Sequence, residues 1–137
     1  MPARPTNLYH ALIRTHHITS RKKVTKIKKA AAKHTDYVLI RSGGSPGIMY
    51  CEGSEEGVNE WVSNVQNLRY KDYQCIRKPA ALDQATLTQV KSSPRGGFEE
   101  IESVTEFKDK MISFGLLDWW RTAMGYEASD DKISGSG

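Results

Sequence analysis

The polar and apolar positions follow two different periods along the first half of the chain. Four short runs are rich in β-branched and aromatic residues and are bounded by polar or turn-forming residues, which predicts four strands. These runs are ALIRTHHI (11–18), DYVLIRS (36–42), GIMYCEG (47–53) and DYQCIRK (72–78). The Gly-Gly-Ser-Pro sequence between the second and third runs predicts the turn of a hairpin.

Two longer segments carry apolar residues at helical spacing instead. Residues 20–34 begin with Ser20, which can cap a helix that has one apolar stripe and is otherwise covered by lysine. In the second segment Ser54 is the expected cap, and Glu55 and Glu56 suit the positive end of the helix dipole. The expected buried positions are Val24, Ile27, Ala30 and Ala31 in the first helix and Val58, Trp61, Val62, Val65 and Leu68 in the second.

The order strand, helix, strand, strand, helix, strand predicts an α+β fold, the ferredoxin-like split βαβ sandwich (βαββαβ). This fold has a four-stranded antiparallel sheet, with strand order 4-1-3-2 and both helices on one side. The strands that carry Cys51 and Cys75 then lie on either side of the first strand. Because adjacent strands are about 4.8 Å apart, the two sulfurs are expected to be too distant for a disulfide.

The composition changes after Pro79. Residues 79–97 are small, polar and turn-rich, which predicts a flexible loop. FEEIES (98–103) could form a short fifth strand, and Ser103 with Glu106 is a capping box for a C-terminal helix or helix pair. The expected organisation is an N-terminal arm (1–10), a ferredoxin-like core (11–78), the loop (79–97), a strand and helix extension packed on the core (98–126) and a disordered tail (127–137).

Length, composition and charge narrow the class of protein. A chain of 137 residues fits one domain. The sequence shows neither an apolar run of the roughly 20 residues that span a bilayer nor a secretory signal, so we expect an intracellular monomer, nuclear or cytoplasmic. Two cysteines outside any Cys-x-x-Cys pair favour reduced thiols, and neither a metal nor a cofactor is expected.

The net charge of +4 is unevenly distributed. Residues 1–35 contain nine Lys and Arg and no Asp or Glu, whereas residues 79–137 contain six basic and ten acidic residues. A concentrated basic segment attracts phosphate backbones, although it can also be a solvated helix face.

Three stretches of the sequence resemble a known family. They are HHITSRKK (His16 to Lys23), GSPGIMYCEG (Gly44 to Gly53), and Trp61 followed by LRYKDYQCIRK (Leu68 to Lys78). They are similar to the C-terminal domain shared by the spliceosomal pre-mRNA-processing protein three and the RWD-domain-containing protein two group, a domain of unknown function in many members. The resemblance implies a ferredoxin-like fold and, in the spliceosomal branch, a domain that grips paired small nuclear RNAs and their single-stranded end.

These features favour a small, non-catalytic RNA-binding module as the function. We expect the basic first helix and Arg and Lys residues at the sheet edge to contact phosphates, and His16 to stack on a base or bond a phosphate. Because His16 and His17 alternate along a strand, their rings are expected to face opposite sides. The candidate RNA-binding residues are Arg14, His16, Arg21, Lys22, Lys23, Lys26, Lys29, Arg41, Arg69, Arg77 and Lys78.

Two other classes of function stay open. A protein–protein interaction domain could use an uncovered sheet face or the aromatic C-terminal helix. On such a face Tyr37, Tyr50 and Tyr73 would be stacking platforms or half-buried packing residues. A small hydrolase on the same fold is the weakest alternative, because the sequence brings together no acidic pair, nucleophile with base, or phosphate loop. We therefore expect no catalytic residues.

Overall fold

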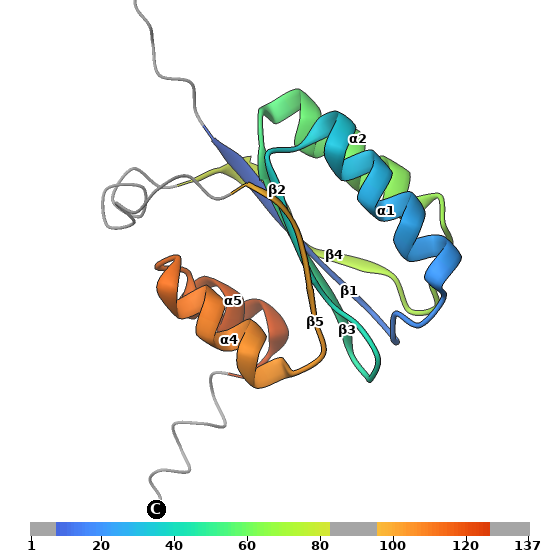
Figure 1. The fold of residues 1–137 in the computed structure, drawn as a ribbon. Helices are drawn as coiled ribbons and strands as arrows, with labels where there is room; N and C mark the ends of the chain where they lie inside the picture. Colours follow the sequence, from blue (N-terminus) through green and yellow to red (C-terminus); the bar gives the residue numbers. More distant parts are fainter. Residues whose placement is uncertain (1–7, 83–95, 127–137) are drawn as a thin grey trace, which may run out of the picture.

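The computed structural model describes residues 8–82 and 96–126, and it places a five-stranded sheet between two pairs of helices (Figure 1). Helices α1 and α2 cover one face of the sheet, and α4 and α5 lie against the other. The fold class is therefore α+β, as predicted. In chain order the elements are β1 (Tyr9–Thr15), α1 (Arg21–His34), β2 (Tyr37–Arg41), β3 (Gly47–Gly53), α2 (Glu55–Gln66), β4 (Gln74–Ala81), β5 (Gly97–Ile101), α4 (Val104–Ser113) and α5 (Leu117–Met124).

Serine side chains start three of the helices, as the sequence predicts. The Oγ of Ser20 accepts a hydrogen bond from the Lys23 N–H at 3.2 Å. Ser54 Oγ accepts from the Gly57 N–H at 3.0 Å, and Ser103 Oγ accepts from the N–H of Glu106 at 3.1 Å. Each cap satisfies a backbone donor that the first helical turn leaves unpaired, and this fixes where each helix begins.

The strand order in the sheet is β4-β1-β3-β2-β5. Strands β1 to β4 follow the predicted order and pair antiparallel, so the strands of Cys51 and Cys75 do lie on either side of β1. The prediction of a four-stranded antiparallel sheet is wrong, because β5 joins the sheet parallel to β2 and makes the pairing mixed. The expected fifth strand is confirmed, and it covers the edge that β2 would otherwise expose.

Two strands are shifted from their predicted bounds. Strand β1 begins two positions before the predicted run (11–18) and ends at Thr15, three positions before the end of that run. Strand β4 begins at Gln74, two positions after the predicted start, and continues through Pro79 to Ala81. Pro79 is compatible with β4 because this strand is an edge of the sheet, where a residue without an N–H leaves no ladder bond unmade. The predicted loop (79–97) is therefore wrong at both ends, because residues 79–81 belong to β4 and Gly97 belongs to β5. Residues 83–95 of that loop, the first seven residues and the predicted tail lie outside the described residues.

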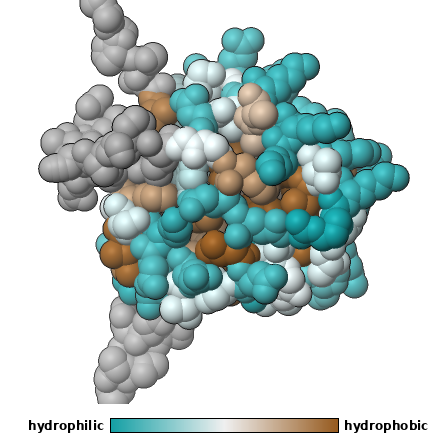
Figure 2. Space-filling model, viewed as in Figure 1, coloured by the Kyte–Doolittle hydropathy of each residue, from teal (hydrophilic) through white to brown (hydrophobic). Residues whose placement is uncertain are grey.

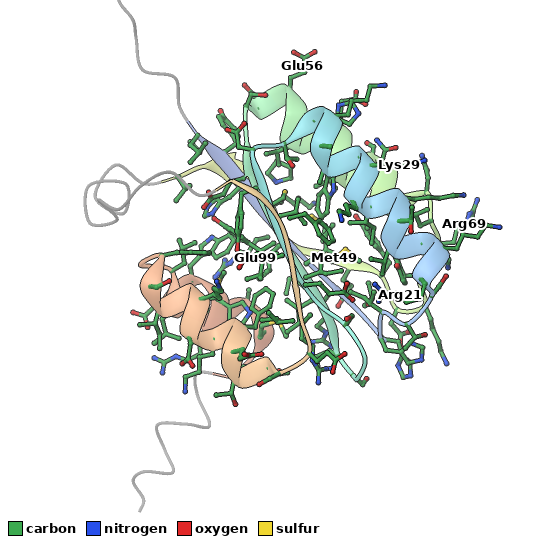
Figure 3. The ribbon with its side chains drawn as sticks, in the orientation of Figure 1. Arg21, Lys29, Met49, Glu56, Arg69 and Glu99 are labelled. Atoms are coloured by element: carbon green, nitrogen blue, oxygen red, sulfur yellow. The ribbon has the colours of Figure 1, made fainter. Side chains whose placement is uncertain are left out.

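Apolar side chains fill both spaces between the sheet and its helices. The first core contains Met49 and Trp61 and lies beneath α1 and α2 (Figure 3). The second core joins Tyr50 of the sheet to Phe107 of α4 and Trp120 of α5. The expectation of an uncovered sheet face is therefore wrong: the C-terminal helices bury it. None of the described helices is both long and apolar enough to cross a membrane.

Helices α1 and α2 touch through their backbones at one point. A Cβ atom at Gly57 would collide with the carbonyl oxygen of His34, so the N-terminal turn of α2 can lie against the last turn of α1 only because residue 57 is glycine. A groove lies between the two helices, lined by residues of α1 and by the last turn of α2 with the residues that follow it.

Candidate nucleic-acid interface

Four lysines form one stripe along α1. Lys22, Lys26, Lys29 and Lys33 are spaced by four, three and four residues. At about 100° per residue this spacing places them on one side of the helix, and Val24, Ile27 and Ala31 on the opposite side. The structure buries those three apolar residues, so the four lysines, which we call the lysine stripe, point away from the sheet. The stripe spans about 16 Å of helix axis.

Among residues 8–82 and 96–126, no carboxylate forms an ion pair with the lysine stripe. Helix α1 contains no Asp or Glu, and the described part of the chain offers no ion-pair partner to any stripe lysine. Hydrophilic side chains cover the α1 side of the molecule in Figure 2, and Lys29 and Arg69 both point outward from the helical layer in Figure 3. This surface is therefore a ridge of solvated ammonium groups.

A groove runs between the lysine stripe and α2. Its volume is about 480 Å³, and Lys26, Lys29 and Lys33 line one wall. The opposite wall carries Asn64 and Asn67. Asn64 Nδ2 donates to the Glu60 carbonyl oxygen at 2.8 Å, and its side-chain oxygen remains an acceptor. Ammonium groups beside amides can bind phosphates and the hydrogen-bonding edges of unpaired bases at the same time.

The flanks of α1 have structural partners instead. The Arg21 guanidinium donates two hydrogen bonds to the Glu100 carboxylate, at 2.7 and 2.9 Å, and points from α1 toward β5 (Figure 3). These hydrogen bonds lower the pKa of Glu100 to about 2 and raise the pKa of Arg21. Lys23 Nζ lies 4.7 Å from the ring centroid of Tyr70, in a cation–π contact. Arg21 and Lys23 therefore hold α1 in place.

Arg41 and Arg77 are also used by the fold. Arg41 donates to the carbonyl oxygens of Glu102 and Pro46, at 2.9 and 3.0 Å, and so ties β2 to the hairpin turn and to the end of β5. Arg77 donates to the carbonyl oxygen of Trp119 on the α5 side of the sheet. Arg41 and Arg77, which were predicted to bind RNA at the sheet edge, therefore do not form a continuous surface with the lysine stripe.

Arg14 and His16 lie at a separate cavity of about 410 Å³, which Asp72 also lines. His16 Nδ1 is 3.5 Å from an oxygen of the Asp72 carboxylate, so this cavity already contains a negative charge. The prediction that His16 and His17 face opposite sides is wrong. Strand β1 ends at Thr15, and beyond it the two rings approach to 4.7 Å between centroids.

The remaining candidates are exposed and lie on three different parts of the chain. Lys22 belongs to the stripe, Arg69 has φ 58° in the turn after α2, and Lys78 is exposed on β4. The sequence interpretation missed Lys33, Asn64 and Asn67. Lys33 could have been found from its spacing to Lys29, whereas the two asparagines become relevant only once α2 is known to lie beside the stripe.

The described residues contain no group of three His, Cys, Asp or Glu side chains placed to hold a metal ion. The chain matches no family model. It also matches none of the curated proteins. The case for a function therefore depends on the residues of the chain itself.

Proposed function

We propose that this chain is a small, non-catalytic RNA-binding module, and that the lysine stripe with its adjoining groove is the RNA-binding surface. The observation that carries the proposal is the position of the stripe, directly opposite the buried face of α1 and without a carboxylate on the same helix. A helix face that only kept the protein soluble would more often mix both signs of charge.

The dimensions of the stripe suit several consecutive phosphates. Phosphates of one strand advance about 3.4 Å per nucleotide along the axis of a DNA duplex, and an extended single strand spaces them more widely, so about 16 Å of stripe can follow three to five of them. Each phosphate that a lysine neutralises releases condensed counterions, which favours binding at low salt. Asn64 and Asn67 supply the hydrogen-bonding groups for unpaired bases, so the proposal favours single-stranded RNA.

We also propose the finer fold and family assignments. The order of β1 to β4 with α1 and α2 on one face supports a ferredoxin-like domain extended by β5, α4 and α5. The family resemblance described above supports the choice of RNA among polyanions and a nuclear or cytoplasmic location.

The test is an amide-resolved NMR titration with a short single-stranded RNA and a matched duplex. Single-stranded RNA should shift the amide signals of α1 and of residues 64–68 more than those of α4 and α5. A double variant, Lys26→Glu with Lys29→Glu, should weaken binding at least about tenfold and reduce the slope of log affinity against log salt by roughly 1.5.

A matched control separates a specific surface from net charge. Lys71→Glu with Lys108→Glu makes the same change in charge at exposed positions outside the stripe. This control should bind RNA nearly as tightly as the parent. Equal losses in the two double variants, or no binding by the parent at low salt, would refute the proposed surface.

A further inference from the structure

The two edges of the sheet differ in how well they could accept another strand. Strand β4 forms one edge, and its pairing with β1 contains two register shifts and includes Pro79. Irregular pairing and proline are common protections of an edge against further pairing. Strand β5 forms the other edge, and it pairs with β2 in an unbroken register over all five residues. Among the described residues, β5 is therefore the more regular of the two edges.

The outer side of β5 presents backbone groups that are ready to pair. The Gly97 N–H donates to the Asp36 carbonyl at 3.0 Å, and the Ile101 carbonyl accepts from the Ser42 N–H at 2.9 Å. The direction of the backbone groups alternates along a strand, so Phe98 and Glu100 direct theirs away from β2. Within residues 8–82 and 96–126, no other backbone group bonds to these outward groups.

A cavity beside this edge can receive a side chain. It has a volume of about 340 Å³ and lies between the C-terminal half of α1 and the start of β5. Its lining includes Ala31, Ala32 and Gly97, whose small size leaves the space, and the Phe98 ring forms an apolar wall. Figure 2 shows apolar surface among hydrophilic side chains between α1 and β5. An apolar side chain suits this cavity.

The charged residues beside the cavity indicate which kind of residue a bound strand would place there. Lys28 lines the cavity, and its Nζ lies 5.9 Å from the ring centroid of Phe98. Lys28 forms no ion pair among the described residues, and its positive charge contributes to the lowered pKa of Glu100. The cavity lining also includes a carboxylate, that of Asp36. The nearby Glu100 carboxylate is bound by Arg21 and Ser42. An incoming strand thus meets one cation, Lys28, and one carboxylate, Asp36, at the cavity. Lys28, which lies near the Phe98 wall, is the partner for an acidic residue next to the apolar one.

We propose that the β5 edge binds an extended peptide segment of a partner protein, which adds to the sheet as a sixth strand. The peptide carries an apolar side chain for the cavity and an acidic residue beside it for Lys28. Backbone hydrogen bonds to Phe98 and Glu100 provide affinity, and the cavity with Lys28 provides specificity. Lys28 lies on a flank of α1 away from the lysine stripe, so RNA and peptide would use different faces of the same helix.

The experiment begins with selection from a random nonapeptide phage library against the full chain. Selected peptides should contain an acidic residue close to an apolar one, and the resynthesised peptide should shift the amide signals of Phe98 and Glu100. Methylation of the peptide nitrogens, one at a time, should weaken binding strongly at every second residue only. This alternation is specific to strand addition, because only alternate N–H groups face β5.

Two protein variants with equal charge change complete the test. Lys28→Glu should weaken peptide binding about fivefold or more and leave RNA affinity close to that of the parent. Lys29→Glu should leave peptide binding unchanged and weaken RNA binding. The peptide proposal and the RNA proposal can therefore fail separately.

Three results would overturn the peptide proposal. The first is a library selection that yields no peptide acting at β5. The second is an N-methyl scan without alternation. The third is concentration-dependent dimerisation that shifts the same β5 amides, which would assign the edge to a second copy of the chain.

Discussion

Arg77 of β4 contacts Trp119 of α5 through two hydrogen bonds to its carbonyl oxygen and through a cation–π contact with its indole ring. Its Nε and Nη2 donate to the Trp119 carbonyl oxygen at 3.2 and 2.9 Å, and the guanidinium carbon lies 5.7 Å from the indole ring centroid. The indole also stacks on His10 of β1, with ring centroids 4.1 Å apart and planes tilted by 10°. Arg77 thus helps to dock α5 on the sheet.

Replacing Arg77 by alanine should therefore loosen α5 and leave RNA binding unchanged. We expect a loss of about 1–2 kcal/mol in the free energy of unfolding, because a charged donor to a half-buried carbonyl is removed. Chemical denaturation measures the loss, and amide hydrogen exchange should show faster opening of α5. Lys78→Ala, on the adjacent exposed position, is the control and should change stability little. Weaker RNA binding by a folded Arg77→Ala protein would contradict the structural role.

Lys33 should contribute to RNA binding as much as Lys29 does. Both belong to the lysine stripe and both line the groove, so each removed charge should lower the salt slope of log affinity by about 0.7–0.9. Fluorescence anisotropy at several salt concentrations with Lys33→Ala and Lys29→Ala measures this. An effect at Lys29 alone would end the interface before the last turn of α1.

The carboxylate of Asp72 should oppose RNA if the strand reaches the cavity of Arg14 and His16. Replacing Asp72 by asparagine removes a negative charge near His16, and asparagine tolerates the left-handed backbone of this residue (φ 57°). Affinity should then rise about twofold to threefold, with a steeper salt dependence. An RNA titration of this variant and of the parent protein tests whether the strand reaches this cavity. Unchanged affinity would mean that the RNA site is confined to α1 and α2.

Acid should remove a contribution of Glu100 to stability. Hydrogen bonds from Arg21 lower the pKa of Glu100 from its ordinary value of 4.5 to about 2. A depressed pKa of this kind stabilises the folded state fully above pH 4.5, and the stabilisation is lost as the pH falls toward 2. Urea unfolding at a series of pH values should show the loss, and Glu100→Gln should reduce it. Glu60→Gln, at an exposed position of α2, should keep the profile of the parent.

The two thiols should resist modification in the folded protein. Burial raises the pKa of Cys51 well above its ordinary value, and it also raises the pKa of the half-buried Cys75. Since the thiolate is the reactive form, both should react slowly, and Cys75 should react before Cys51. Timed alkylation followed by mass spectrometry gives the order. Fewer than two free thiols in the denatured, unreduced protein would contradict the predicted reduced state.

Local signals in the sequence predict the elements well. The serine caps of α1, α2 and α4 follow from a small polar residue at the right distance from an apolar period, and β3 occupies the predicted residues 47–53. The buried stripe of α1 likewise follows from its spacing. These features depend on residues within a few positions of each other, which is the range that a period or a cap can report.

The partners of the charged side chains could not be predicted in this way. Arg21 and Glu100 are 79 positions apart, and Arg77 and Trp119 are 42 apart. The count of cations in a segment does not reveal which of them meet a carboxylate or carbonyl once the chain folds. The parallel pairing of β5 with β2, which makes the sheet mixed, also joins residues that are far apart in the sequence. No local pattern reports such a pairing, so the sequence prediction did not include it.

Gly57 has a consequence for how the RNA-binding groove would work. Because α1 and α2 meet there through backbone atoms, no change of side-chain rotamer can alter their separation at that point. The backbone contact therefore sets the separation of the two helices near His34, which also lines the groove, whichever rotamers the lysines adopt. In the proposed interface, adjustment on binding would then come from the lysine side chains and from the flexible single strand.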